Sequence, residues 1–208
     1  MMSAKRIVLA LLSAATLAAC SAPAPLPDFR YYRLAPMSAV TPLPTPLLDR
    51  PLVVERFGAD GVHGERPILY ANDPDSLKIS QYHYQLWNDP PPVLVQQRLL
   101  DRLLAARIAP TVTERASGRT LTYRLSGTVF RFERVLDEDR PVEVVLGLRL
   151  SLLADGADLP LLETREQIRV PVRGERVEDS AAALSQAIDQ LVDGWLQKLR
   201  ARQPAPAA

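Results

Sequence analysis

Few residues in this sequence carry side chains that could do chemistry. Cys20 is the one cysteine among the 208 residues, so it cannot form a disulfide within the chain, and its thiol is a strong nucleophile when ionised. The two histidines, His63 and His83, are twenty residues apart with no cysteine near them, a pattern that does not favour a metal site. His83 lies between two tyrosines, and we interpret it as a strand or surface histidine rather than a general base.

Two pairs of carboxylates lie in segments rich in turn residues. Acidic side chains in turns often cap the backbone. We therefore interpret both pairs, Asp137 with Asp139 and Asp155 with Asp158, as structural. The sequence contains no GxxxxGK[ST] loop, no GxSxG elbow and no HExxH pair. We therefore expect no catalytic residue, no cofactor and no metal, and we do not expect an enzyme. A hydrolase that depends on His83 is the disfavoured alternative.

Cys20 stands at the end of a segment typical of exported proteins. Basic residues at positions 5 and 6 precede an apolar stretch, and small residues follow at positions 18 and 19. This stretch covers about 13 residues, against about 20 needed to cross a bilayer. Leu17-Ala18-Ala19-Cys20 resembles the lipobox of bacterial lipoproteins, which are cut before the cysteine that then carries acyl chains. We expect a signal peptide at 1–19 and lipidation of Cys20.

The alternative is an ordinary signal peptide that leaves Cys20 as a free thiol exposed to oxidation. Ser21, the next residue, resembles an outer-membrane sorting residue of lipoproteins, so we expect an anchor in the outer membrane that faces the periplasm. Residues 20–28 contain three prolines and would form the lipidated tether. Residues 29–202 are expected to form a single domain and 203–208 a disordered tail.

Charge gives no indication of a nucleic-acid partner. The chain has 25 lysines and arginines against 24 acidic residues, and no run of like charges. The hydrophobic content of 47% is that of a globular protein.

The first half of the domain combines short strands with one helix. We expect strands at 29–34 and 52–57, a proline-rich surface loop between them, and a small hairpin of 68–70 with 77–79. Apolar residues at helical spacing predict a helix over about 92–109, with Gln96, Gln97, Asp101 and Arg102 on its polar side.

The second half alternates apolar and polar residues over long stretches. The segments starting at Leu121, Val142 and Leu162 predict an antiparallel meander, with a bulge at Gly127 in the first. A second long helix is expected to begin at about Val177, because Asp179 and Ser180 favour a helix N-terminus. The predicted class is α+β: a mainly antiparallel sheet with two long helices packed on one side.

Residues 81–92 concentrate aromatic and proline side chains before the first helix. One interpretation is that they form an exposed surface for a partner, with Tyr82, Tyr84, Trp87 and Pro90 as candidate contacts. The other is that Trp87 and the tyrosines pack the helix against the sheet.

Several of these features together resemble a known family. The lipobox, Tyr31-Tyr32-Arg33-Leu34, Pro51-Leu52-Val53-Val54 and the segment 84–91 before a leucine-rich helix resemble the ABC-type transport auxiliary lipoproteins, the family that includes paraquat-inducible protein C. Leu86 stands where that family often has arginine.

The resemblance implies an accessory role in transport. Proteins of this kind resemble subunits that work beside an ABC ATPase, its permease and a protein with a mammalian-cell-entry (MCE) domain, helping phospholipid or another apolar solute to pass between membranes. Assembly into a homo-oligomer is compatible with the resemblance. Two alternatives stay open: a structural lipoprotein that assists outer-membrane assembly without a transporter, and a lipid carrier with its own pocket.

Overall fold

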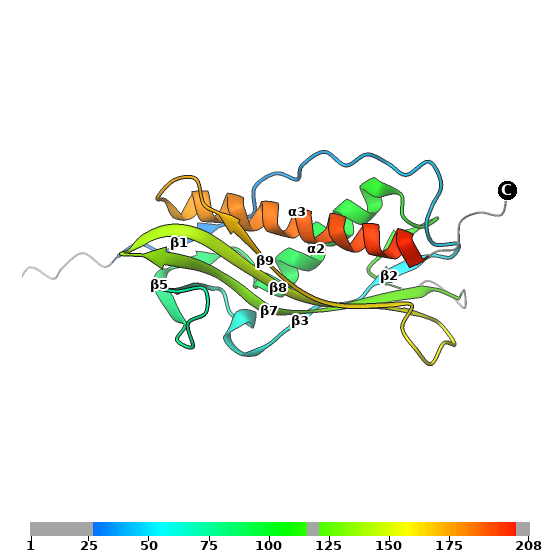
Figure 1. Ribbon diagram of the computed structural model, residues 1–208, viewed down its shortest axis with the longest axis horizontal. Coiled ribbons are helices and arrows are strands. Elements are labelled where there is room, and N and C mark those ends of the chain that lie inside the picture. Colours follow the sequence, from blue (N-terminus) through cyan, green and yellow to red (C-terminus); the bar gives the residue numbers. More distant parts are fainter. Residues whose placement is uncertain (1–26, 116–120, 203–208) are drawn as a thin grey trace, which may run out of the picture.

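The structure, a computed structural model, describes residues 27–115 and 121–202 and arranges them as one mixed sheet with two helices on the same side of it (Figure 1). The α+β class and the placement of both helices are therefore confirmed. The helices are α2 (Pro91–Ala106) and α3 (Val177–Arg202), and a short 3₁₀ turn, η1, covers Gly61–Gly64. The strands are β1 (Arg30–Tyr32), β2 (Leu52–Val54), β3 (Gly58–Ala59), β4 (Pro67–Ala71), β5 (Ser80–Trp87), β6 (Val112–Thr113), β7 (Tyr123–Asp137), β8 (Arg140–Ala154) and β9 (Leu162–Pro171).

Strand β7 organises the sheet. It pairs with β8 along its whole length, and β8 pairs with β9, so the predicted antiparallel meander is confirmed. The opposite edge of β7 pairs in turn with β2, β3 and β4, all parallel to it. The expectation of a mainly antiparallel sheet is therefore wrong. The residue pattern of a three-residue strand shows that the strand is buried, but not whether it runs parallel or antiparallel to its neighbour. The loops before β2, β3 and β4 place each of these strands parallel to β7.

The predicted hairpin around residues 72–75 is present with shifted bounds. Its second strand is β5, which begins at Ser80 and extends to Trp87, and it pairs antiparallel with β4. The aromatic segment is therefore a strand of the sheet. Strand β5 then pairs in parallel with β1, which ends the sheet order at that side.

Gly127 does not form the predicted bulge. The register of β7 against β8 shifts instead between Val129 and Arg131 and again after Val135. The glycine is needed for a close approach, because a Cβ atom at position 127 would lie 2.6 Å from the ring of Phe57.

Helix α3 buries the stripe that the sequence predicts, whereas on α2 the buried face is centred on Leu94, Leu99 and Leu103, and Leu104 of the predicted stripe is 46% exposed. Helix α2 ends at Ala106 rather than 109, since Arg107 adopts a left-handed conformation (φ 54°) and its N–H bonds back to the carbonyls of Leu103 and Leu104. On α3 the stripe is buried throughout. Its residues are Leu184, Ile188, Leu191, Trp195 and Leu199.

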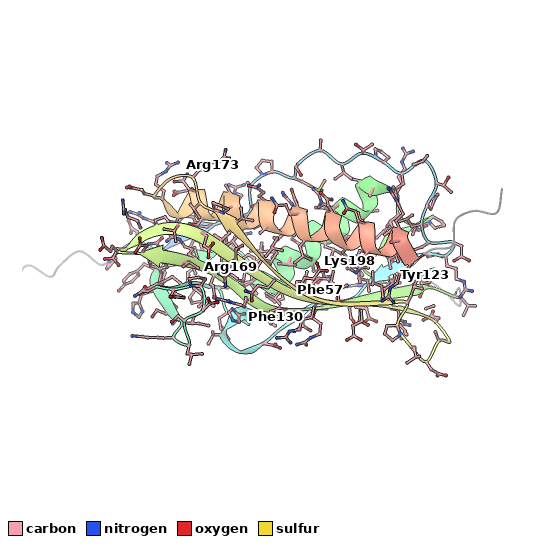
Figure 2. The ribbon with its side chains drawn as sticks, in the orientation of Figure 1. Phe57, Tyr123, Phe130, Arg169, Arg173 and Lys198 are labelled. Carbon is pink, nitrogen blue, oxygen red and sulfur yellow. The ribbon has the colours of Figure 1, made fainter. Side chains whose placement is uncertain are left out.

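The core lies between the sheet and these helices. Trp87 and Phe132 meet there edge to face, with ring centroids 5.3 Å apart. Phe130 lies on β7 toward the face away from the helices, where the guanidinium of Arg165 stands 4.3 Å from its ring (Figure 2).

Candidate functional site

The predicted anchor lies outside the described residues. Cys20, the signal peptide, most of the tether and the tail at 203–208 belong to the parts of the chain that are not described, so lipidation of Cys20 stays a prediction. The described chain begins at Pro27 and enters the sheet at β1. A tether attached here therefore acts on the edge strand of the sheet.

The four predicted contact residues differ in their surroundings. Trp87 is only 1% exposed, so it packs in the core, in agreement with the alternative interpretation. Tyr82 is half-buried, and its hydroxyl accepts a hydrogen bond of 2.8 Å from Arg134. Pro90 is half-buried where α2 begins. Tyr84 alone is well exposed, and it stacks edge to face on Phe29 with centroids 5.5 Å apart.

Tyr82 belongs to a polar link between the sheet and α3. Arg134 is buried, donates to Ser180 Oγ at 2.8 Å, and stands 5.4 Å from the Tyr82 ring. Burial raises the pKa of Tyr82 and lowers the pKa of Arg134, because it removes hydration from the charged form of each side chain and so favours the neutral form. At neutral pH the tyrosine is a neutral acceptor for a charged donor, an arrangement that joins β5, β7 and α3.

A charge cluster, buried except for Asp193, lies where α2 packs on α3. We call Arg98, Arg102, Asp189 and Asp193 the helix clamp. Arg98 binds Asp189 through two nitrogens at 2.7 and 2.9 Å, which is the bidentate geometry that favours arginine. Arg102 lies 3.2 Å from Asp189 and 2.6 Å from Asp193.

The helix clamp also holds the segment that follows β1. Arg98 donates to the carbonyls of Ala35 and Pro36 at 2.7 and 3.2 Å, and the Ser38 hydroxyl donates to Asp189 at 2.7 Å. This segment continues as the proline-rich loop that crosses the helices in Figure 1. The clamp therefore fixes the chain leaving β1 to both helices at once.

The protonation of Asp189 follows from these contacts. Burial by itself would raise its pKa, but the hydrogen bonds from Arg98 and Ser38 and the charges of Arg98 and Arg102 outweigh burial, so the pKa of Asp189 lies below its ordinary value. The carboxylate is therefore charged at neutral pH.

Sequence reasoning missed the helix clamp. Helical periodicity predicts that Arg102 and Gln96 lie on the polar side of their helix, but Arg102 is 2% exposed and Gln96 is also buried. Gln96 accepts from the backbone N–H of Phe57 at 3.4 Å, and Arg102 has its two carboxylates. The periodicity of one helix predicts that its polar residues face solvent. In this structure Gln96 and Arg102 instead have hydrogen-bonding or charged partners on other elements. The spacing of Arg98 and Arg102 by four, with Asp189 and Asp193 also four apart, is the signal that could have indicated a pair of facing rows.

A second buried polar group lies near η1. His63 is buried, as is Glu133 on β7, and the pKa of His63 is lowered mainly by burial. Glu133 pairs with Arg131, which also donates to the carbonyl of Pro74 at 2.8 Å. His83, in contrast, is exposed on β5.

Of the four carboxylates in the two pairs, Asp155 has side-chain and backbone partners. Asp155 accepts from both the backbone N–H and the hydroxyl of Thr122 at 2.9 Å and from Arg124 at 2.9 Å. Asp139 lies in the two-residue turn between β7 and β8, where it and Glu138 have φ values of 68° and 46°. Within residues 27–115 and 121–202, no group of three or more His, Cys, Asp or Glu side chains is placed to hold a metal ion.

A groove of about 780 Å³ lies between β1 and the start of α3. Its lining mixes aromatic and aliphatic side chains with charged ones, and it is open to solvent. The charged residues are Arg30, Arg33 and Glu178. A lipid carrier would need a cavity that encloses its ligand, and this groove is open to solvent.

Comparison with known proteins decides the family. The model of the ABC-type transport auxiliary lipoprotein component matches residues 32–194, which is most of the chain. The chain belongs to this family. The predicted resemblance is therefore confirmed, and with it an accessory role in transport as a lipoprotein. The family is described as an auxiliary component of transport and not by an enzymatic activity.

Two solved structures share the fold. Protein XCC0632 from Xanthomonas campestris has a TM-score of 0.67 and 20% identity, over 82% of this chain and 95% of its own. A structure titled only as an uncharacterised protein has a TM-score of 0.67 and 16% identity, over 83% of this chain and 99% of its own. No curated protein matches the sequence. In the described part of the chain, no helix has the length and apolar character that a membrane crossing requires.

Proposed function

We propose that this protein is a lipid-anchored, periplasmic accessory subunit of an MCE-type ABC transport system, which moves phospholipid or another apolar solute between the inner and outer membranes and so supports envelope integrity. Membership of the transport auxiliary lipoprotein family is the observation that carries this proposal. The acylated residue is Cys20, and Ser21 after it directs the protein to the outer membrane. Two or more acyl chains give stable anchoring where one gives only weak binding.

The fold supports an accessory role over that of a carrier. The two helices and the sheet bury a continuous apolar core, and the groove beside β1 is open and partly charged. A subunit of this kind acts by contact, so its partners would be the MCE-domain protein or the permease and ATPase complex.

Affinity purification of the full chain from detergent-solubilised envelopes tests the partnership. We expect an MCE-domain protein or an ABC permease to co-purify with a C-terminally tagged chain. Recovery of outer-membrane assembly factors without any transporter part would contradict the proposal and favour the structural-lipoprotein alternative.

Localisation is tested by membrane separation on a density gradient. The native chain is expected in the outer-membrane fraction, and the variant Ser21→Asp in the inner-membrane fraction, because aspartate at this position resembles an inner-membrane retention signal. Cys20→Ser is the matched control, which should leave the membrane in plain buffer since it carries no acyl chain. A Cys20→Ser chain that stays membrane-bound would overturn the anchoring mechanism.

A further inference from the structure

Several apolar side chains are exposed at the end of the molecule where the chain enters the sheet. We call them the apical cluster, and they come from β1, from β5 and from the loop between β4 and β5. Leu77 is fully exposed, at 105% of its reference area, and the aromatic rings are 42 to 58% exposed. The members are Phe29, Tyr31, Leu77, Ile79 and Tyr84. Exposed apolar groups that gather on one part of a protein mark a contact surface.

Strand pairing brings these segments to one end. Strand β1 runs parallel to β5 with Arg30 opposite Gln85, so Phe29 lies beside Tyr84, where the two rings stack. Ile79 precedes the first residue of β5 and Tyr84 is the fifth residue of that strand, so the ring pair and Ile79 lie roughly 16 Å apart along β5. Strand β4 pairs with the last part of β7, so its following loop lies at the same end as the β7–β8 turn, at the left in Figure 1.

Charges of both signs surround the apical cluster, and the acidic ones are more numerous. Arg30 and Lys78 are exposed on the basic side, and the guanidinium of Arg66 stands 5.2 Å from the Tyr31 ring. The acidic side chains are Asp28, Asp73 and those of the β7–β8 turn, residues 137–139. No excess of basic groups would draw this end to a membrane, so attraction here depends on apolar burial.

The position of the tether favours a lipid surface as the occupant. Phe29 lies nine positions after Cys20, and at the polyproline rise of about 3.1 Å per residue this stretch would span about 28 Å. An anchor that short keeps the apical cluster at a high effective concentration near the bilayer, so a contact too weak to hold a free protein becomes populated. Tyrosine and phenylalanine also have side chains suited to the boundary between headgroups and acyl chains.

We propose that the apical cluster inserts into the headgroup and acyl boundary of the membrane that holds the acylated Cys20, and that it sets the orientation of the domain. This proposal rests on the proposed acylation. The long strands β7 and β8 then point away from the bilayer, and the β8–β9 loop lies at their far end. Fifteen residues at about 3.3 Å each place that loop roughly 50 Å from the apical cluster.

A tryptophan reporter at Leu77 tests the proposal. The acylated full chain with Leu77→Trp is reconstituted on phosphatidylcholine vesicles with and without brominated acyl chains, and indole emission is measured. The native Trp87 and Trp195 are 1% and 0% exposed and provide a constant background. The introduced indole should shift to shorter wavelength and lose about half of its intensity to the brominated lipid, because interfacial groups lie roughly 5–10 Å below the headgroup level.

Leu159→Trp is the matched control, since Leu159 is 79% exposed in the β8–β9 loop at the other end. Its emission should equal that of the same variant in solution. Addition of 0.5 M NaCl and replacement of a third of the phosphatidylcholine by phosphatidylglycerol should leave the Leu77→Trp quenching unchanged, because apolar burial dominates. Quenching that falls sharply in salt would overturn the apolar mechanism.

Intact-protein mass separates this proposal from the one on which it rests. An unacylated chain that stays off the vesicles would overturn both. An acylated, vesicle-bound chain whose Leu77→Trp emission stays as in solution would overturn the docking of the apical cluster alone. Shielding of the indole only after a co-purified transporter protein is added would also overturn the docking, since the cluster would then be a protein contact.

Discussion

Replacement of Asp189 is expected to be among the most damaging single changes in the described domain. Asp189→Ala removes the carboxylate that Arg98 binds at 2.7 and 2.9 Å and that Arg102 approaches at 3.2 Å. Both arginines stay buried, at 7% and 2% exposed. A buried pair broken on one side costs about 3–5 kcal/mol, out of a total stability of about 5–15 kcal/mol.

Urea unfolding followed by circular dichroism measures this loss. With a slope of about 2–3 kcal/mol per molar, the midpoint should fall by more than about 1 M. Asp193→Ala is the matched control, because the Asp193 side chain is 50% exposed and Arg102 keeps Asp189 as a partner when Asp193 is removed, so this change should cost clearly less. If Asp189→Ala costs no more than Asp193→Ala, the helix clamp does not hold the helices and the reasoning fails.

A double substitution and a pH series extend the test. Arg98→Met with Asp189→Leu should recover part of the loss, because no charge of this pair is then left unpaired. The pKa of Asp189 is lowered in the folded state, so its stabilisation is complete above the ordinary value of 3.8 and is lost as the pH falls through the lower folded value. Asp189→Ala should remove that part of the acid slope, and an unchanged slope would contradict the assignment.

Three further predictions concern other parts of the fold. Gly127→Ala should destabilise the domain by about 1–3 kcal/mol in urea unfolding, because the new Cβ would lie 2.6 Å from the Phe57 ring, and Phe57→Leu in the same chain should reduce that cost. The pKa of His63 is lowered by burial, so the free energy of unfolding should fall as the pH drops below 6.5, and His63→Gln should flatten that part of the profile. Glu138→Asn with Asp139→Gly supplies the pair that suits two successive positive φ values and should raise the melting temperature by a few degrees, at about 1 kcal/mol; a lower melting temperature would count against the turn geometry.

The long elements of this fold could be predicted from sequence because their patterns are local. Val144, Leu146, Leu148, Leu150 and Leu152 alternate without interruption, and all are fully buried on β8. The stripe from Leu184 to Leu199 is equally regular on α3. In each case one face of the strand or helix packs against a single neighbouring layer, so the spacing of the apolar residues alone identifies the buried face.

The remaining features depend on partners that are distant in sequence. Whether β2 runs parallel or antiparallel is decided by its pairing with Tyr123 to Leu125, about seventy residues away. Arg98 and Asp189 are 91 residues apart, and the matching i,i+4 spacings on the two helices suggest facing rows but do not identify which residues pair. Trp87 likewise looks the same in sequence as an exposed interface residue, and only its packing on Phe132 identifies it as core.

The attachment of β1 determines how the domain would respond to mechanical force. A pull on Pro27 acts along β1, whose bonds to the parallel strand β5 are then loaded in shear, all at the same time and not one after another. Behind β1, the carbonyls of Ala35 and Pro36 are held by Arg98, so tension that reached them would pass to both helices. A domain attached at its first strand and bound at its far end would therefore resist tension along its length without β1 peeling from the sheet.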